Sequence, residues 1–235
     1  MRHKSMKRFN SLTPHDITVD RHIHTDYTHG HIGIREIVKK AKQLHLFEIA
    51  ITEHVRRQST YCHEYIEEIK DAAEEYDLNI LVGFESKVID AHGNLDLNEK
   101  CRRYADIIIG SVHSIPSNGK FIRPEHLNPS ELQEAEHRFG LAIIKSGSCH
   151  ILGHAGGFSL NIHGKFDPNR MEELICACAN FGTAFEINSR YHTDIVGWLM
   201  NKLSEYNPYV SIGSDAHTIS EVGSCLSLFT HSNNV

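Results

Sequence analysis

Short apolar segments alternate with longer segments of helical periodicity along almost the whole chain. Seven of the short segments have the length and the β-branched residues of buried strands, namely 17–19, 48–52, 80–84, 105–111, 151–153, 184–188 and 210–214. Segments with the spacing of helices follow at 34–44, 61–76, 130–145, 171–181 and 193–206. Because a repeated strand–helix order is typical of parallel sheets, we predict one α/β domain over residues 1–235. A closed or nearly closed barrel of seven strand–helix units is expected, with an open doubly wound sheet as the alternative.

The composition is that of a globular domain rather than of a membrane protein. The chain has 235 residues, of which 40% are hydrophobic, and this suffices for a sizeable core. Its longest apolar runs, such as 107–109, fall far short of the roughly 20 residues that cross a bilayer. Residues 1–15 are polar and basic and lack the apolar stretch of a secretory signal, so we expect a flexible N-terminal segment and a cytoplasmic protein.

Charge and cysteine content narrow the classes of function. Lys and Arg number 24 and Asp and Glu number 30, and the resulting net charge of -6 argues against a dedicated nucleic-acid binder while allowing a small anionic substrate. The six cysteines form no CxxC pair, and we expect them to be reduced and mostly buried. No feature of the sequence indicates an oligomeric state.

Histidine is unusually abundant. The chain contains 19 histidines, and they are dispersed along the domain rather than gathered in a tag. Neutral imidazole is the commonest protein ligand for metal ions near neutral pH. The composition therefore favours a metal-binding protein.

The candidate ligands fall at the carboxyl ends of the expected strands. After the first strand, Asp20, His22 and His24 share one face because side chains alternate along a strand. The later strands end in polar residues too: Glu53 and His54, Glu85, His113, His154, Glu186 with Asn188 and Arg190, and Asp215 with His217. A single histidine after a strand is usually a hydrogen-bonded loop residue, but these signals recur at the same end of successive strands. In α/β barrels that end carries the active site, so we predict a metal site there.

The order of these motifs resembles that of the PHP (polymerase and histidinol phosphatase) family. The motifs are Asp20-x-His22-x-His24, His29-Gly30, Thr52-Glu53-His54, Gly83-Phe84-Glu85, Ser111-Val112-His113, Gly153-His154 and Gly213-Ser214-Asp215-Ala216-His217. Each is short, but together they extend from Asp20 to about Gly223 in the family's order, and the chain looks most like the histidinol-phosphatase branch. The resemblance implies a distorted (β/α)7 barrel, similar to a TIM barrel, that holds two or three divalent ions.

The resemblance also implies which residues hold each ion. Carried over by position, the first ion would be held by His22, His24, Glu85 and Asp215, the second by Glu85, His113 and His154, and the third by His29, His54 and His217. Glu85 would bridge two ions, and Glu85, Asp215 and His217 would be the catalytic residues. Two positions depart from the pattern or leave a choice: Glu53 stands where the family usually has Asp, and both His29 and His31 follow His24. We assign His29 because Gly30 follows it.

A cluster of imidazoles with a bridging carboxylate suits zinc, iron or manganese and not calcium or magnesium, which prefer oxygen ligands. Two such ions roughly 3.5 to 4 Å apart lower the pKa of a shared water and stabilise an in-line displacement at phosphorus. No Ser or Cys nucleophile is then required, and the sequence has no GxSxG motif. Arg190, Arg56 and Arg123 follow expected strands and are candidates to bind the phosphoryl group. Glu186 and Asn188 are expected to face the barrel interior, with their role open.

We therefore expect a metal-dependent phosphatase that acts on a small phosphomonoester such as histidinol phosphate. A phosphodiesterase or exonuclease of the same family is the first alternative, although the acidic charge argues against it. An amidohydrolase or deaminase would also use the HxH pair and a late Asp, but it would not need His29, His54 and His217. Metal storage is disfavoured because the ligands converge on one rim.

Overall fold

The computed structural model of the chain describes residues 6–117 and 119–230. The strands are β1 (Lys7–Arg8), β2 (Val19–Ile23), β3 (Glu48–His54), β4 (Asn79–Lys87), β5 (Ile107–Ser111), β6 (Ile115–Ser117), β7 (Lys120–Ile122), β8 (Ile151–Leu152), β9 (Ala184–Asn188) and β10 (Tyr209–Gly213). The α-helices are α1 (Ile34–Gln43), α2 (Cys62–Tyr76), α3 (Glu99–Arg102), α4 (Pro129–Ser146), α5 (Gly157–His163), α6 (Pro168–Phe181), α7 (Ser189–His192), α8 (Val196–Tyr206) and α9 (Ser227–Thr230). Within the described part of the chain, no helix combines the length and apolarity needed to cross a membrane.

Eight of these strands form one sheet in the order β1-β10-β9-β8-β5-β4-β3-β2. All neighbours are parallel except β1, which pairs antiparallel with β10. The sheet closes where Ile23 at the end of β2 bridges to Ala216 beyond β10, and the amide of His24 donates to the carbonyl of Ala216 at 2.8 Å. The prediction of a distorted seven-unit α/β barrel is confirmed, because the seven expected strands are β2, β3, β4, β5, β8, β9 and β10.

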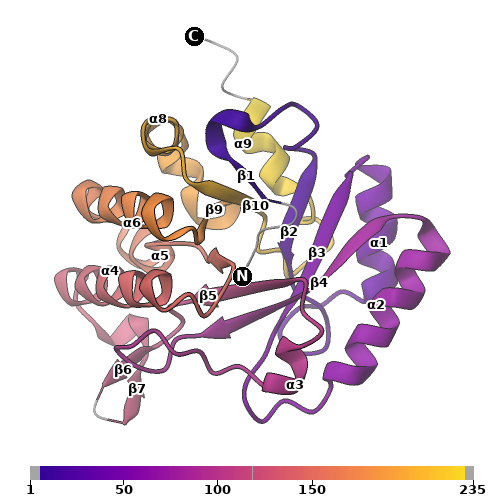
Figure 1. Ribbon diagram of the computed structural model, residues 1–235, viewed down its shortest axis with the longest axis horizontal. Helices are drawn as coiled ribbons and strands as arrows, with labels where there is room; N and C mark the ends of the chain where they lie inside the picture. Colours follow the sequence, from indigo (N-terminus) through magenta and orange to yellow (C-terminus); the bar gives the residue numbers. More distant parts are fainter. Residues whose placement is uncertain (1–5, 118, 231–235) are drawn as a thin grey trace.

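The helices cover the outside of this barrel. Figure 1 shows α1 and α2 beside β2, β3 and β4, and α4, α6 and α8 beside the other half. Alternate strand residues pack outward against these helices and form the larger apolar cluster, as Ile108 does. The others point inward, and at the amino-terminal end of the barrel they form a small apolar plug of Met6, Ala50, Ile107, Ile109, Ile151 and Ala184. Apolar packing therefore fills the lower barrel and leaves the opposite rim for polar side chains.

The segment expected to be flexible is in part packed on the barrel. Residues 1–5 lie outside the described residues. Met6 is 6% exposed and belongs to the inner apolar plug, and the amide of Phe9 donates to the carbonyl of Pro208 at 2.9 Å. Met6, Phe9 and Leu12 are too few and too widely spaced to predict this packing from sequence.

Two cysteines correct the expectation that all six are reduced. Cys62 at the start of α2 and Cys101 in α3 form a disulfide, 39 residues apart in the sequence. The pairing has no CxxC signature because only the folded chain brings α2 and α3 together. The other four cysteines are free, and of these only Cys176 is not buried.

Candidate metal centre

The rim at the carboxyl ends of the strands is polar because the last inward-facing residues of the strands are polar. On β4, for example, Leu81 lies beside the inner apolar plug, and Glu85 on the same face reaches the rim with an exposure of 1%. Asp215 follows β10 in the same way, and His22 and His24 continue the inner face of β2 with no exposed surface. Each strand thus changes from apolar to ligand-type residues along one face.

The rim brings most of the predicted ligands together. Three groups have potential ligand atoms within 4.8 Å of one another: His22 with His24 and Asp215, His54 with Glu85 and His113, and His24 with His54 and His217. His154 joins the second group, because its Nε2 lies 3.0 Å from Oε1 of Glu85, and the Nε2 of His113 lies 3.2 Å from the same oxygen. Eight of the nine predicted ligands therefore lie in one continuous cluster.

His29, the ninth predicted ligand, lies at the edge of this cluster. Its side chain is exposed, and its ring centroid is 5.5 Å from that of His54. The group that contains His54 and His217 is completed by His24 and not by His29. His29 lines the cavity beside the cluster, whereas His31 uses its backbone amide to donate to the carbonyl of His217 at 2.9 Å. The division of the nine residues among separate ions remains a prediction.

One buried atom indicates that the cluster suits a cation. Oε2 of Glu85 is buried and makes no hydrogen bond within the described part of the chain. A buried carboxylate oxygen without a partner is strongly unfavourable, and Oε2 of Glu85 faces the imidazole of His54 at 3.1 Å and that of His24 at 3.4 Å. A divalent ion bound by these groups would satisfy them, and the mixture of imidazole and carboxylate donors fits zinc, iron or manganese.

The protonation equilibria of the cluster are strongly shifted. Burial opposes the charged form of Glu85, but the surrounding imidazoles of His113, His22 and His54 keep its pKa well below the usual value. Burial likewise opposes a charge on His24, yet its contacts with Asp215 and Glu53 raise its pKa to about 9. Loss of solvation lowers the pKa of His113 to about 4. Metal binding must therefore displace a proton from His24, whereas His113 is already neutral at pH 7.

Glu186, on β9, holds two of the candidate ligands at once. Its Oε1 accepts a hydrogen bond from Nδ1 of His22 at 2.6 Å, and its Oε2 accepts one from the backbone amide of His154 at 2.5 Å. The first contact leaves Nε2 of His22 to face the cluster. The second supports a residue with φ of 25°, in a region that side chains other than glycine seldom adopt.

We expect Glu186→Gln to weaken metal binding by roughly 10- to 100-fold. The amide offers a single acceptor oxygen, so it serves either His22 or His154 but not both. Competition with a coloured chelator measures the affinity, and Glu74→Gln on the exposed face of α2 is the matched control. An unchanged affinity in Glu186→Gln would show that neither ligand depends on this carboxylate.

Glu53 acts similarly on His24, although the family usually has Asp at this position. Its Oε1 lies 3.6 Å from Nδ1 of His24, and it accepts hydrogen bonds from the amide of Thr25 at 2.9 Å and from the hydroxyls of Thr25 and Thr28. Burial opposes ionisation of Glu53, but these contacts lower its pKa to about 2. The longer side chain thus connects His24 to the loop that follows β2.

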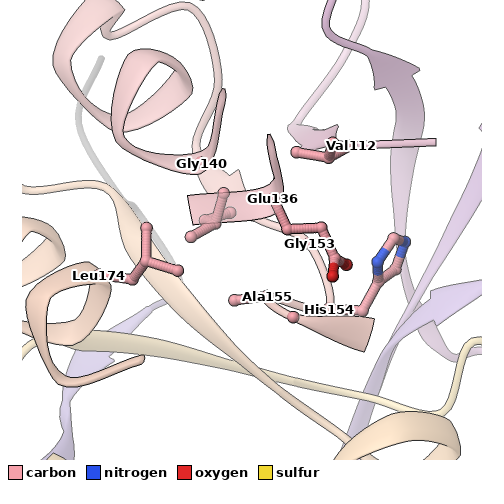
Figure 2. Close-up of a pocket in the computed structure, with 9 residues that line it drawn as sticks. Val112, Glu136, Gly140, Gly153, His154, Ala155 and Leu174 are labelled. Carbon is pink, nitrogen blue, oxygen red and sulfur yellow. The ribbon is translucent and has the colours of Figure 1, made fainter. Parts of the chain in front are cut away.

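A second buried carboxylate, Glu136 of α4, lies behind His154. It accepts hydrogen bonds from the amides of Phe158 and Ser159 at 2.9 and 3.0 Å and so holds the first turn of α5. Figure 2 shows its carboxylate beside the imidazole of His154, at a cavity of about 10 Å³ that has room for one water. The sequence analysis did not single out Glu136, although the helical period places it on the apolar face of α4 with Leu132 and Phe139.

The predicted substrate arginines occupy different places. The guanidinium of Arg190 lies beside the cluster, where it donates to the carbonyl of Asp215 at 3.0 Å and to Oε1 of Glu221 at 2.9 Å. Arg56 lines a cavity of about 230 Å³ next to the cluster, formed by His29, His54, Val55, Arg56, Glu85, Lys87, His113 and Phe158. Arg123 is exposed and does not line this cavity. Lys87 was missed by the sequence analysis, although the period of two places it on the face of Glu85.

Comparison with known proteins agrees with this geometry. The sequence model of the PHP domain matches residues 20–190. A probable phosphatase of Thermoanaerobacter sp. (strain X514) is 28% identical over 217 residues, which cover 88% of this chain and 82% of that protein. The DNA polymerase/3'-5' exonuclease PolX of Bacillus subtilis (strain 168) is 26% identical over 209 residues, 85% of this chain but only 34% of the polymerase.

A solved structure shares the fold. The histidinol phosphate phosphatase of Lactococcus lactis subsp. lactis Il1403, crystallised with zinc, L-histidinol and phosphate, superposes with a TM-score of 0.69 at 18% identity. The alignment covers 92% of this chain and 93% of that one. At this identity the likeness establishes the barrel and not the substrate.

Proposed function

Because this chain belongs to the PHP domain family, we propose that it is a metal-dependent phosphatase that hydrolyses a small phosphomonoester such as histidinol phosphate. The observation that carries the proposal is the cluster of His22, His24, His54, His113, His154, His217, Glu85 and Asp215 at one rim of the barrel. The relatives named as probable phosphatases, and the barrel shared with a histidinol phosphate phosphatase, support the same reaction class.

The residues of the cluster would hold two or three divalent ions. When bound, such ions lower the pKa of water and neutralise charge on the phosphoryl oxygens. Glu85 lies between the imidazoles of His54 and His113, and in this proposal its two oxygens would contribute to more than one ion site. Glu186 and Glu53 hold His22 and His24 in orientation, which keeps the ligand geometry fixed through the reaction.

In this proposal Arg190 would orient the phosphoryl group. Its guanidinium is held by Glu221 and by the backbone of Asp215, so its direction is fixed before substrate arrives. The side chain is 33% exposed and keeps access to the rim. A preoriented guanidinium stabilises developing negative charge without reorganisation during the reaction.

The test of the proposed activity is release of inorganic phosphate. The purified protein, loaded with zinc, manganese or iron, is assayed with a panel of phosphomonoesters, phosphodiesters and amides. We expect turnover of monoesters, histidinol phosphate among those tested. Hydrolysis of amides alone would identify an amidohydrolase instead.

Arg190→Ala is expected to lower kcat/KM for the best monoester by roughly 10- to 100-fold, about 1.4 to 3 kcal/mol of transition-state stabilisation. Metal content should be unchanged, because no ligand atom is removed. Steady-state kinetics and elemental analysis of the same preparation test both statements, with Arg35→Ala on α1 as the control. Full activity of Arg190→Ala would remove this residue from the site.

A phosphodiesterase is the second candidate, favoured by the similarity to PolX. Against it, the net charge of -6 offers no broad basic track for a polynucleotide, whose binding depends on several phosphate contacts. A labelled oligonucleotide incubated beside the monoester panel distinguishes the two. Rapid degradation of the oligonucleotide with negligible monoesterase activity would favour the nuclease.

A further inference from the structure

Two cationic side chains lie just beyond two of the candidate metal ligands. His54 at the end of β3 pairs in register with Glu85 on β4. Lys87 lies two residues after Glu85 on β4, and two residues along a strand span roughly 6.6 Å on the same face. Arg56 lies two residues beyond the end of β3, in a segment that lines the same cavity. The arginine and the lysine therefore form an outer layer above the ligands, on one wall of the cavity of about 230 Å³ that also contains His29, His113 and Phe158.

These two cations lack acidic partners. Among residues 6–117 and 119–230, no carboxylate forms an ion pair with the side chain of Lys87 or Arg56. The ammonium of Lys87 lies instead 3.9 Å from the ring centroid of Phe121, on the β6–β7 hairpin at the edge of the barrel. Arg190 differs, since Glu221 and Asp215 already neutralise its guanidinium. The outer layer thus presents positive charge to whatever enters the cavity.

Arg56 and Lys87 lie where the leaving group of the substrate would be bound. The phosphoryl group would be bound at the ligand cluster, where Arg190 approaches from the side of Asp215 and His217. Arg56 and Lys87 line the cavity beside His54, Glu85 and His113, whereas Arg190 does not line it. An amine on the leaving group, as in histidinol phosphate, would meet two like charges there, whereas an anionic group would meet two cations.

We propose that the substrate of this phosphatase carries a second anionic group, a carboxylate or a second phosphate, which Arg56 and Lys87 bind. This inference rests on the proposed phosphatase function. Phe121 assists by holding the ammonium of Lys87 through a cation–π contact, so that a lysine with four rotatable bonds is kept near the cavity. Arg56 and Lys87 thus determine which monoester is preferred, while the residues of the metal cluster carry the reaction.

Pairs of substrates that differ in one charged group test this proposal. 3-Phosphoglycerate is compared with glycerol 3-phosphate, and fructose 1,6-bisphosphate with fructose 1-phosphate, with histidinol phosphate as the cationic case. We expect kcat/KM of the anionic member to exceed that of its partner about tenfold in at least one pair. A carboxylate preference raises the ratio in the first pair, and a preference for a second phosphate raises it in the second.

Lys87→Met should reduce this ratio to about threefold or less, mainly by raising KM for the anionic substrate, since it removes the charge and keeps an unbranched side chain only one atom shorter. Lys145→Met is the control, because Lys145 is exposed at the end of α4 that leads into β8, at the far end of the barrel. The melting temperatures of both variants establish that they are folded. A wild-type enzyme that hydrolyses histidinol phosphate or the neutral esters best, or an unchanged ratio in Lys87→Met, would overturn the inference and leave the phosphatase intact. The absence of phosphate release from every monoester would overturn both.

Discussion

Glu85→Gln is expected to lower kcat/KM by at least about a thousandfold, roughly 4 kcal/mol, and more than any single histidine substitution. Its carboxylate is 1% exposed and lies within 3.5 Å of five imidazoles, those of His22, His24, His54, His113 and His154. An amide has no negative charge with which to bridge two cations. Steady-state kinetics, with elemental analysis of the same sample, measures both the activity and the number of ions retained.

The control for this substitution is Glu67→Gln, on the exposed surface of α2. It removes one carboxylate charge without touching the cluster, and it should behave as the unchanged protein. Near-normal turnover and metal content in Glu85→Gln would show that this residue does not bridge two ions.

Removal of metal is expected to abolish phosphatase activity, and zinc, manganese or iron should restore it. The protein as purified should contain two or three ions per chain, since nine ligand-type side chains exceed what one four- to six-coordinate ion uses. Elemental analysis before and after treatment with a chelator gives the stoichiometry. Titration of the metal-free protein, followed by phosphate release, gives the number of ions that activity requires.

A second readout of this experiment does not depend on activity. Binding to the native state alone stabilises a protein, so the melting temperature of the metal-free chain should rise as metal is added. The buried, unpaired oxygen of Glu85 gives the physical reason, because an ion would supply its missing partner. A content of at most one ion after expression in metal-rich medium would contradict a multinuclear cluster.

The sequence predicts the barrel well because its signals are local and repeated. The seven parallel strands each combine apolar, β-branched residues with a polar end, and the period of two identifies the inner face. Strand β1 and the β6–β7 hairpin were not predicted, because β1 consists of two exposed basic residues and the hairpin lies outside the strand–helix repeat. The disulfide between Cys62 and Cys101 was not predicted either, since it depends on how α2 packs beside α3.

The site was predictable only as far as strand ends reveal it. His22 and Glu85 lie near the carboxyl ends of β2 and β4, His24 and Asp215 follow β2 and β10, and the register of parallel strands brings such residues to one rim. Glu186 supports the site through hydrogen bonds with Nδ1 of His22 and the backbone amide of His154. These contacts form only in the folded chain, so the sequence does not predict them. The positions of Arg190 and Arg123 relative to the cluster were not predictable either, because hydrophobic periodicity does not predict the path of the chain after a strand.

His54 and Glu85 are paired across β3 and β4, and this pairing also bears on how the substrate preference of such an enzyme could change. In the proposed arrangement the metal ligands would carry the reaction, and Arg56 and Lys87, which line the adjacent cavity, would meet the rest of the substrate. Neither residue belongs to the apolar core clusters, so substitutions at positions 56 and 87 would change the preferred substrate and leave the metal ligands in place. Under the proposal, these two positions are where an engineer would begin to change the specificity.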